Sequence, residues 1–135
     1  MKVDKQRLLI FSVSFLLPLL YFRTLFLFLP DDYISPLRRL IGLNLHHFHF
    51  GIIILTIATL LLLFYKINTF SVTLSGLGLG LIIDSFFPSL FIETIRENEL
   101  LVYFQHLPDT LALFAIILVL AMSISTISNK TKRTK

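Results

Sequence analysis

The sequence predicts an all-α membrane protein, in which four transmembrane helices form an antiparallel bundle with both ends of the chain in the cytoplasm. Three observations support this prediction: 56% of the 135 residues are hydrophobic, only 15% are charged, and the hydrophobic residues fall in long runs. A soluble domain usually carries about 25% charged residues. The composition therefore excludes a soluble enzyme and a disordered tail.

Four runs have the length that a membrane span requires, which is roughly 17 to 25 helical residues. Each run must be a helix, because an open strand cannot satisfy its backbone groups in lipid. Within the single domain that we expect for residues 1–135, the runs cover residues 8–29, 48–65, 67–87 and 110–129. We expect the third run to stop at Pro88, since proline commonly follows a helix end.

The distribution of lysine and arginine predicts the orientation of these spans. Eight basic residues flank the ends on one side, whereas Arg38, Arg39 and Arg96 flank the other, and Arg23 lies inside the first span. The positive-inside rule assigns the richer side to the cytoplasm. We therefore expect a multi-pass protein of a prokaryotic plasma membrane with both termini cytoplasmic. The basic tail is typical of contact with the lipid bilayer, and nothing points to a nucleic-acid partner.

The connections between the spans differ in length. Only residues 66–68 join the second span to the third, which predicts an antiparallel helical hairpin. The two outer connections, Pro30–His47 and Pro88–Asp109, are long enough to be functional or partly ordered. Residues 37–45 fit a short interfacial helix, because their arginines can extend toward water while their leucines face lipid.

Glycines of the third span fall on one stripe with an acid. Gly76, Gly80 and Asp84 are each four residues apart, and such spacing places side chains on one helix face. Small residues at this spacing let a neighbouring helix approach closely. We expect that neighbour to be the second span, with Gly51 near its start, and we expect Asp84 to point toward the histidine end of that span.

Three histidines cluster at the start of the second span, at the depth of Asp84. His46 and His49 are three residues apart and share one side, whereas His47 is rotated by about 100° from His46. Two imidazoles and a carboxylate are a common ligand set for Zn²⁺ or non-haem iron, with His47 as a further candidate ligand. Contact with lipid headgroups explains the same cluster. Asp84 needs a partner or a function, because a carboxylate inside a span costs several kcal/mol.

The second outer connection supplies further polar groups on the same side. Glu93, His106 and Asp109 are candidates to complete a metal shell or to act as general acid and base. The acidic residues of this connection equally fit the solvated face of a loop. The chain has no cysteine, which excludes disulfides and thiolate metal ligands.

The stretch from His46 to Gly51, followed by Gly76 to Asp84, resembles a group of small prokaryotic membrane proteins of no known activity. Those proteins carry His-His-x-x-x-Gly at the opening of one span and Gly-x-Gly-Leu-x-x-Asp-Glu at the close of the next. The likeness covers about 40 residues, the hairpin alone. It implies that six residues correspond to that pattern: His46, His47, Gly51, Gly78, Gly80 and Asp84. Ser85 stands where the group usually has a second acid, which argues against a dicarboxylate centre.

These features leave three functions open. The first is a metal-dependent membrane hydrolase or oxidase that acts on a lipid, although no recognised signature such as H-E-x-x-H is present. The second is a non-enzymatic accessory or structural subunit of a homo-oligomer or larger membrane complex, whose cluster holds an ion, a haem or a headgroup. Haem is less favoured than a divalent metal. The third is a component of proton or cation transport, which ranks last because transporter sites usually lie near the midplane.

Overall fold

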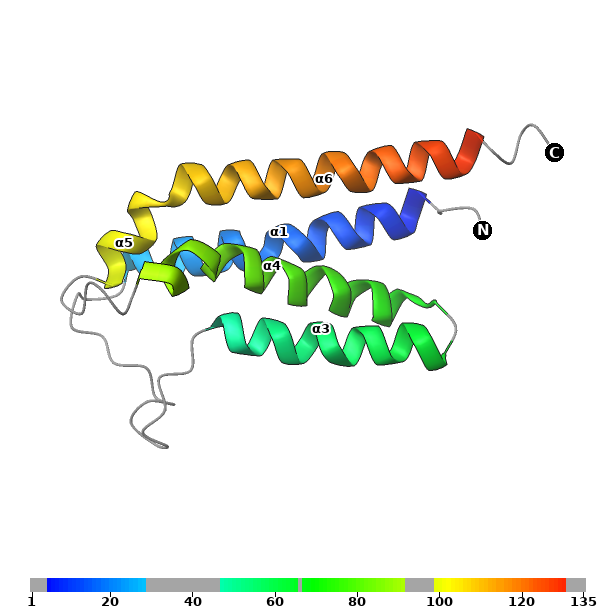
Figure 1. The fold of residues 1–135 in the computed structure, drawn as a ribbon, viewed down its shortest axis with the longest axis horizontal. Coiled ribbons are helices and arrows are strands. Elements are labelled where there is room, and N and C mark those ends of the chain that lie inside the picture. Colours follow the sequence, from blue (N-terminus) through cyan, green and yellow to red (C-terminus); the bar gives the residue numbers. More distant parts are fainter. Residues whose placement is uncertain (1–4, 29–46, 66, 92–98, 131–135) are drawn as a thin grey trace.

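A computed structural model of the chain describes residues 5–28, 47–65, 67–91 and 99–130. Four of its helices are long and apolar enough to cross a membrane, and they lie side by side with alternating direction (Figure 1). These helices are α1 (Lys5–Phe28), α3 (His47–Phe64), α4 (Thr69–Phe91) and α6 (Leu107–Lys130). The prediction of an all-helical bundle with four apolar spans is therefore confirmed. The interfacial helix expected at residues 37–45 lies outside the described residues.

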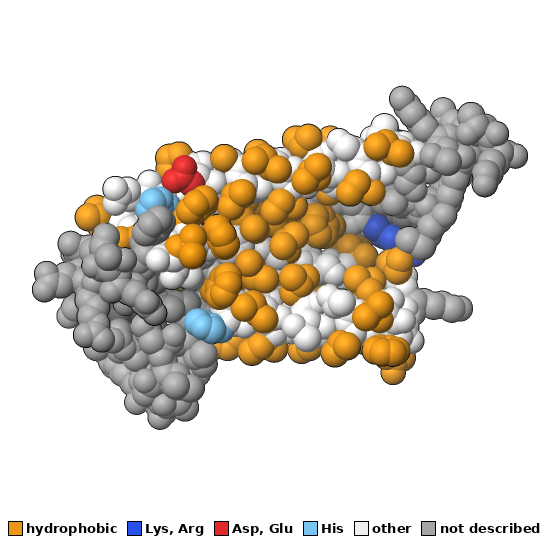
Figure 2. All heavy atoms as spheres, viewed as in Figure 1, with side chains coloured by type: hydrophobic (Ala, Val, Ile, Leu, Met, Phe, Trp, Pro, Cys, Tyr) orange, Lys and Arg blue, Asp and Glu red, His pale blue; other side chains and the backbone are white. Residues whose placement is uncertain are grey.

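Hydrophobic side chains cover most of the described surface on the face that Figure 2 shows. Large apolar residues such as Leu63, Val119 and Ile124 are more than half exposed in the isolated chain. A surface of this kind is stable next to lipid tails, where helices satisfy their own backbone groups. The described part of the chain is thus a membrane protein by composition and by the placement of its apolar residues.

Helix α4 is the centre of the bundle, because its glycines admit one neighbour on each side. A Cβ atom on Gly76 would meet the backbone and side chain of α1 at 2.8 Å, at Phe11 and Ser14. A Cβ atom on Gly80 would collide with the carbonyl of Phe15. The stripe of Gly76 and Gly80 therefore packs against α1. Our expectation that it packs against the second span is wrong.

The second span uses a different glycine pair. A Cβ atom on Gly78 would lie 2.7 Å from the backbone nitrogen of Leu55, and one on Gly51 would lie 2.9 Å from the carbonyl of Gly78. Residues two apart on a helix point to nearly opposite faces. The Gly-x-Gly-x-Gly pattern thus presents Gly76 and Gly80 to α1 and Gly78 to α3. This alternation explains the error, since the spacing of four identifies a face but not its partner.

The ends of α4 differ from the bounds that we expected. Asn68 caps the start, where its side-chain oxygen accepts from the backbone of Ser71 at 2.8 Å and the Ser71 hydroxyl accepts from the backbone of Asn68 at 3.2 Å. At the other end the helix runs through Pro88 to Phe91, so the expected stop at Pro88 is wrong. Proline removes one backbone donor, and only a single turn follows it here.

Helix α6 packs on the bundle through an aromatic core. The ring of Phe114 packs at a tilt against that of Phe15 of α1, with centroids 4.5 Å apart, and both side chains are buried together with Leu19. Before α6 lies α5 (Glu99–Gln105), a short helix in the outer connection that we expected to be functional or partly ordered. It crosses the end of the bundle that is remote from both termini (Figure 1).

A single methyl group should test the close approach of α1 to α4. Gly80→Ala places a Cβ atom against the backbone of Phe15, so α1 must move away or strain. We expect the variant to lose about 1–3 kcal/mol of unfolding free energy, as overpacked cores do. Unfolding in mixed detergent micelles measures this loss. The exposed Ala115→Leu substitution on α6 is the control and should change stability little; an equal loss in both variants would contradict the packing.

Candidate functional site

A buried ion pair joins α1 to α4 near the end remote from the termini. The Nε of Arg23 donates to Oδ1 of Asp84 at 3.3 Å, and the Asp84 side chain is fully buried. Asp84 lies on the stripe of Gly76 and Gly80, so the face that admits α1 also carries the acid to the arginine. A charge within a membrane span is costly unless it is paired. Each residue therefore supplies the partner that the other requires.

Helix α5 contributes one residue that contacts both members of the pair. The hydroxyl of Tyr103 donates to Oδ2 of Asp84, and the backbone carbonyl of Tyr103 accepts from Nη1 of Arg23. The guanidinium also lies over the Tyr103 ring, with its carbon 3.7 Å from the ring centroid. Such cation–π contacts are stronger where water is excluded. Tyr103 thus holds α5 against the pair by three different interactions.

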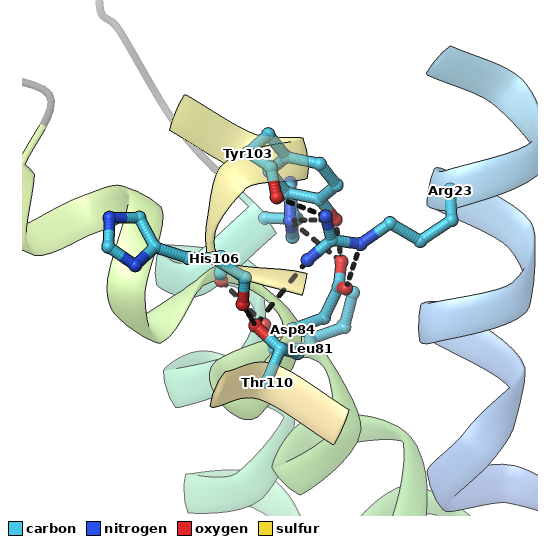
Figure 3. Close-up of polar contacts among 8 residues, drawn as sticks. Arg23, Leu81, Asp84, Tyr103, His106 and Thr110 are labelled. Carbon is cyan, nitrogen blue, oxygen red and sulfur yellow. Dashed lines mark hydrogen bonds and ion pairs between the residues drawn. The ribbon is translucent and has the colours of Figure 1, made fainter. Parts of the chain in front are cut away.

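The other hydrogen-bonding group around Arg23 comes from α6. Thr110 lies 3.5 Å from Nη2 of Arg23 through its hydroxyl oxygen, and that hydroxyl donates to the carbonyl of His106 at 2.9 Å. Figure 3 shows Thr110 and Tyr103 on opposite sides of the guanidinium, with Asp84 beneath it. Each of the three guanidinium nitrogens therefore has an acceptor, which lowers the cost of burying the charge.

His47 completes the network from α3. Its Nε2 lies 3.2 Å from Oδ2 of Asp84 and 3.3 Å from the hydroxyl oxygen of Tyr103. Because both neighbours are oxygens, a proton on Nε2 lets His47 donate to them, whereas a bare nitrogen would face the carboxylate lone pairs. The imidazole stacks on Phe22 of α1, with centroids 4.3 Å apart and ring planes 10° apart. Its side chain is 13% exposed, so it forms the edge of the network.

The charges of this network balance. Arg23 supplies a cationic group and Asp84 an anionic one, so the charges of the pair compensate each other. Asp84 lies seven residues before the end of α4, roughly 10 Å along the helix axis. The carboxylate accepts from Arg23 on one oxygen and from Tyr103 on the other, with His47 beside the second. In this arrangement each carboxylate oxygen is bonded by a protein donor.

Of the metal ligands that the sequence suggested, only some lie together in this network. His47, which we ranked behind its neighbours, is the histidine beside Asp84. His49 is exposed and lies two residues further along α3, on nearly the opposite face, where it contacts Phe48. His46 lies outside the described residues. Within the described segments, no three histidine, cysteine or acidic side chains are grouped closely enough to hold a metal.

The candidate acid–base residues form a separate pair at the start of α6. Nδ1 of His106 lies 3.1 Å from Oδ2 of Asp109, whose side chain is 57% exposed. The His106 ring stacks on Phe87, with centroids 5.8 Å apart, and it points away from Arg23 and Asp84 (Figure 3). Glu93 lies outside the described residues. The histidine and the acid thus interact with each other at the surface rather than with the buried network.

Sequence reasoning missed Tyr103 and Thr110, and it placed Arg23 inside the first span without assigning it a partner. The signal for Arg23 was available, because the first span and the third each contain one charged residue in their interior. Tyr103 offered no comparable signal, since a helix of seven residues shows no clear hydrophobic period. Its position follows from the path of the chain around the break between α5 and α6.

A double-mutant cycle should reveal the coupling between Arg23 and Asp84. Arg23→Met or Asp84→Leu alone leaves a buried charge unpaired, which typically costs about 3–5 kcal/mol. The double variant removes both charges, so its loss should be smaller than the sum of the single losses by about 0.5–3 kcal/mol. Unfolding in mixed micelles measures all four proteins. Additive losses would show that the two side chains do not interact.

The surface pair provides the matched control. A cycle of His106→Ala and Asp109→Asn removes a histidine–carboxylate contact at the same end of the bundle, but one that is partly exposed. Its coupling should stay within about 0–1 kcal/mol.

Comparison of this chain with models of known protein families, with curated proteins and with solved structures finds no match. The functional interpretation therefore rests on the geometry of the network. Two properties of that geometry are decisive: Asp84 is bonded by protein donors on both oxygens, and those donors come from helices that are distant in the sequence.

Proposed function

We propose that this chain is a small multi-pass protein of a prokaryotic plasma membrane that serves as a non-enzymatic subunit of a homo-oligomer or larger membrane complex. The occupied carboxylate carries this proposal. Arg23, Tyr103 and His47 surround Asp84 and come from α1, α5 and α3, so the buried polar groups fasten helices together. A buried network whose donors and acceptors bond to one another makes the packing of the helices rigid and specific, which is a structural role.

The exposed faces of α3 and α6 support the role of a subunit. Helix α3 packs along α4 and leaves apolar residues such as Ile53 and Ile57 exposed. The second half of α6 leaves Met122 and Ile127 more than half exposed. In a bilayer, lipid tails or other helices cover such faces, and van der Waals packing drives helix association there. We propose that other helices, from further copies or from a partner, cover part of them.

Native mass spectrometry of membrane vesicles tests the subunit role. We expect the protein to leave the membrane as an assembly heavier than one chain, either as a multiple of its own mass or with a second protein. Gly80 packs inside the chain, against α1. Gly80→Ala should therefore reduce the amount of assembly only in proportion to the loss of folded protein. A mass of one chain throughout a range of gentle activation energies would contradict the proposal.

A metal or ion site centred on His47 and Asp84 is a second candidate. The observation that favours it is the 3.2 Å approach of the His47 Nε2 atom to the Asp84 Oδ2 atom at the edge of the bundle. An imidazole nitrogen and a carboxylate oxygen suit Zn²⁺ or iron, and a hydrolase or oxidase acting on a lipid would use such a metal. Arg23 opposes this candidate, because its positive charge already neutralises the carboxylate.

Elemental analysis of purified protein separates the two candidates. The structural role predicts less than about one-tenth of an equivalent of zinc or iron per chain after dialysis against metal buffer, with no difference between wild type and His47→Ala. The metal site predicts close to one equivalent in the wild type and its loss in His47→Ala, because direct ligation needs bonds of about 2.0–2.2 Å to that ring. His49→Ala is the control, since its ring lies on another face of α3.

The proposed orientation places both termini in the cytoplasm, with the network of Asp84 near the outer face. The excess of lysine and arginine at the side of the termini supports it. Because the chain has no cysteine, single cysteines at Lys5 and Leu101 can report the sidedness of each end. A membrane-impermeant maleimide added to intact cells should label the second position and spare the first. Labelling of the first position but not the second would show that both termini lie outside the cytoplasm and would contradict the proposed orientation.

A further inference from the structure

Helix α5 covers the buried ion pair at one end of the bundle, and Tyr103 is its main attachment. Tyr103 donates to Asp84, accepts from Arg23 and packs its ring edge-on against Phe26 of α1, with centroids 4.7 Å apart. Val102 beside it is also buried. The opposite side of this short helix is exposed, as Leu101 shows. The attachment of α5 therefore depends on the charge pair beneath it.

The connection from α5 to α6 has the features of a hinge. Pro108 has no backbone N–H and its ring crowds the carbonyl four residues earlier, so a helix that continues through this point is weakened and kinked. Across the break, His106 donates to the carbonyl of Val102 at 3.2 Å and Thr110 donates to that of His106 at 3.0 Å. In an unbroken helix the carbonyl of Tyr103 would accept from Leu107, but here it accepts from Arg23. Arg23 of the ion pair thus donates to a carbonyl that would accept a backbone hydrogen bond in a continuous helix.

We propose that α5 is a gate over Asp84, hinged at residues 106–108 and held closed by the Arg23–Asp84 pair. Loss of the pair removes the donor to the Tyr103 carbonyl and the acceptor of the Tyr103 hydroxyl together. The carbonyl of Tyr103 can then accept a hydrogen bond from the backbone N–H of Leu107. This bond extends α6 toward its N-terminus and swings α5 off the end of the bundle. This gate goes beyond the structural role proposed above and does not depend on it.

Opening of the gate changes what Asp84 can bind. In the closed form Tyr103 occupies Oδ2, whereas His47 belongs to α3 and stays beside the carboxylate when α5 leaves. The open form therefore offers a carboxylate oxygen and an imidazole nitrogen side by side, with one acceptor position free. In the closed bundle protein donors bond both carboxylate oxygens, whereas the open bundle can take a cation or a hydrogen-bond donor from the side of the membrane where α5 lies.

Electron paramagnetic resonance distances between two nitroxide labels test the gate in the full-length protein. The chain has no cysteine, so Leu27→Cys and Leu101→Cys introduce the only labelling sites. Leu27 lies at the end of α1 and Leu101 on α5, and both side chains are more than 60% exposed. The otherwise unaltered protein, in lipid nanodiscs, should give one narrow distance distribution.

Asp84→Asn should add a population at longer distance, shifted by about 5 Å or more, the rise of one helical turn. Ala115→Leu on the exposed face of α6 is the control, because it changes a side chain outside both the network and the hinge. It should leave the distribution unchanged. A distribution in Asp84→Asn that equals the unaltered one, in a protein of normal helical content, would overturn the gate.

A second variant decides the matter if Asp84→Asn loses its helical circular dichroism signal. Pro108→Ala leaves every side chain of the network in place and restores the backbone donor that the hinge lacks. The gate predicts a longer-distance population here too, because the new backbone N–H at position 108 can donate to the carbonyl of Phe104 and favours a helix that runs on from α5 into α6. An unaltered distribution in Pro108→Ala would overturn the proposal, since the break would then not be a hinge.

Discussion

The placement of the described helices depends on one constraint: a guanidinium and a carboxylate buried in an apolar bundle must face each other. Arg23 and Asp84 meet this constraint only if α1 packs on the glycine face of α4. Once they meet, the remaining donors and acceptors of the pair need partners, and Tyr103, Thr110 and His47 supply them from three further helices. In lipid, where the hydrophobic effect does not drive helices together, such polar contacts select one arrangement among many.

The small residues of α4 make that arrangement possible. Gly76 and Gly80 bring the backbone of α1 within contact, and Gly78 does the same for α3 on the opposite face. A side chain at any of these positions would separate the helices and would lengthen the path between the charges. Close packing and charge pairing are therefore parts of one design, in which the glycines set the distance and the ion pair sets the register along the helices.

The spans and the all-helical class were accessible from the sequence, because hydrophobic runs and scarce charges have only one solution in a membrane. The spacing of Gly76, Gly80 and Asp84 correctly identified one face of α4. Its partner was not accessible, because the neighbour in sequence is not the only neighbour in space. His47 was ranked behind His46 and His49 for a related reason: helical periodicity relates residues within α3 but does not fix how α3 is rotated against α4. Tyr103 depends on a break at Pro108 that no periodicity encodes.

A distance measurement inside a lipid bilayer tests the ion pair most directly. Solid-state nuclear magnetic resonance with ¹³C at the Asp84 carboxyl and ¹⁵N in the Arg23 guanidinium reports dipolar coupling between the two groups. Direct contact predicts a carbon-to-nitrogen distance of about 3–4 Å, as hydrogen-bonded arginine–carboxylate pairs have. A distance beyond about 6 Å in the folded protein would place the charges apart. The network, and the arrangement of helices around it, would then have to be rebuilt on other contacts.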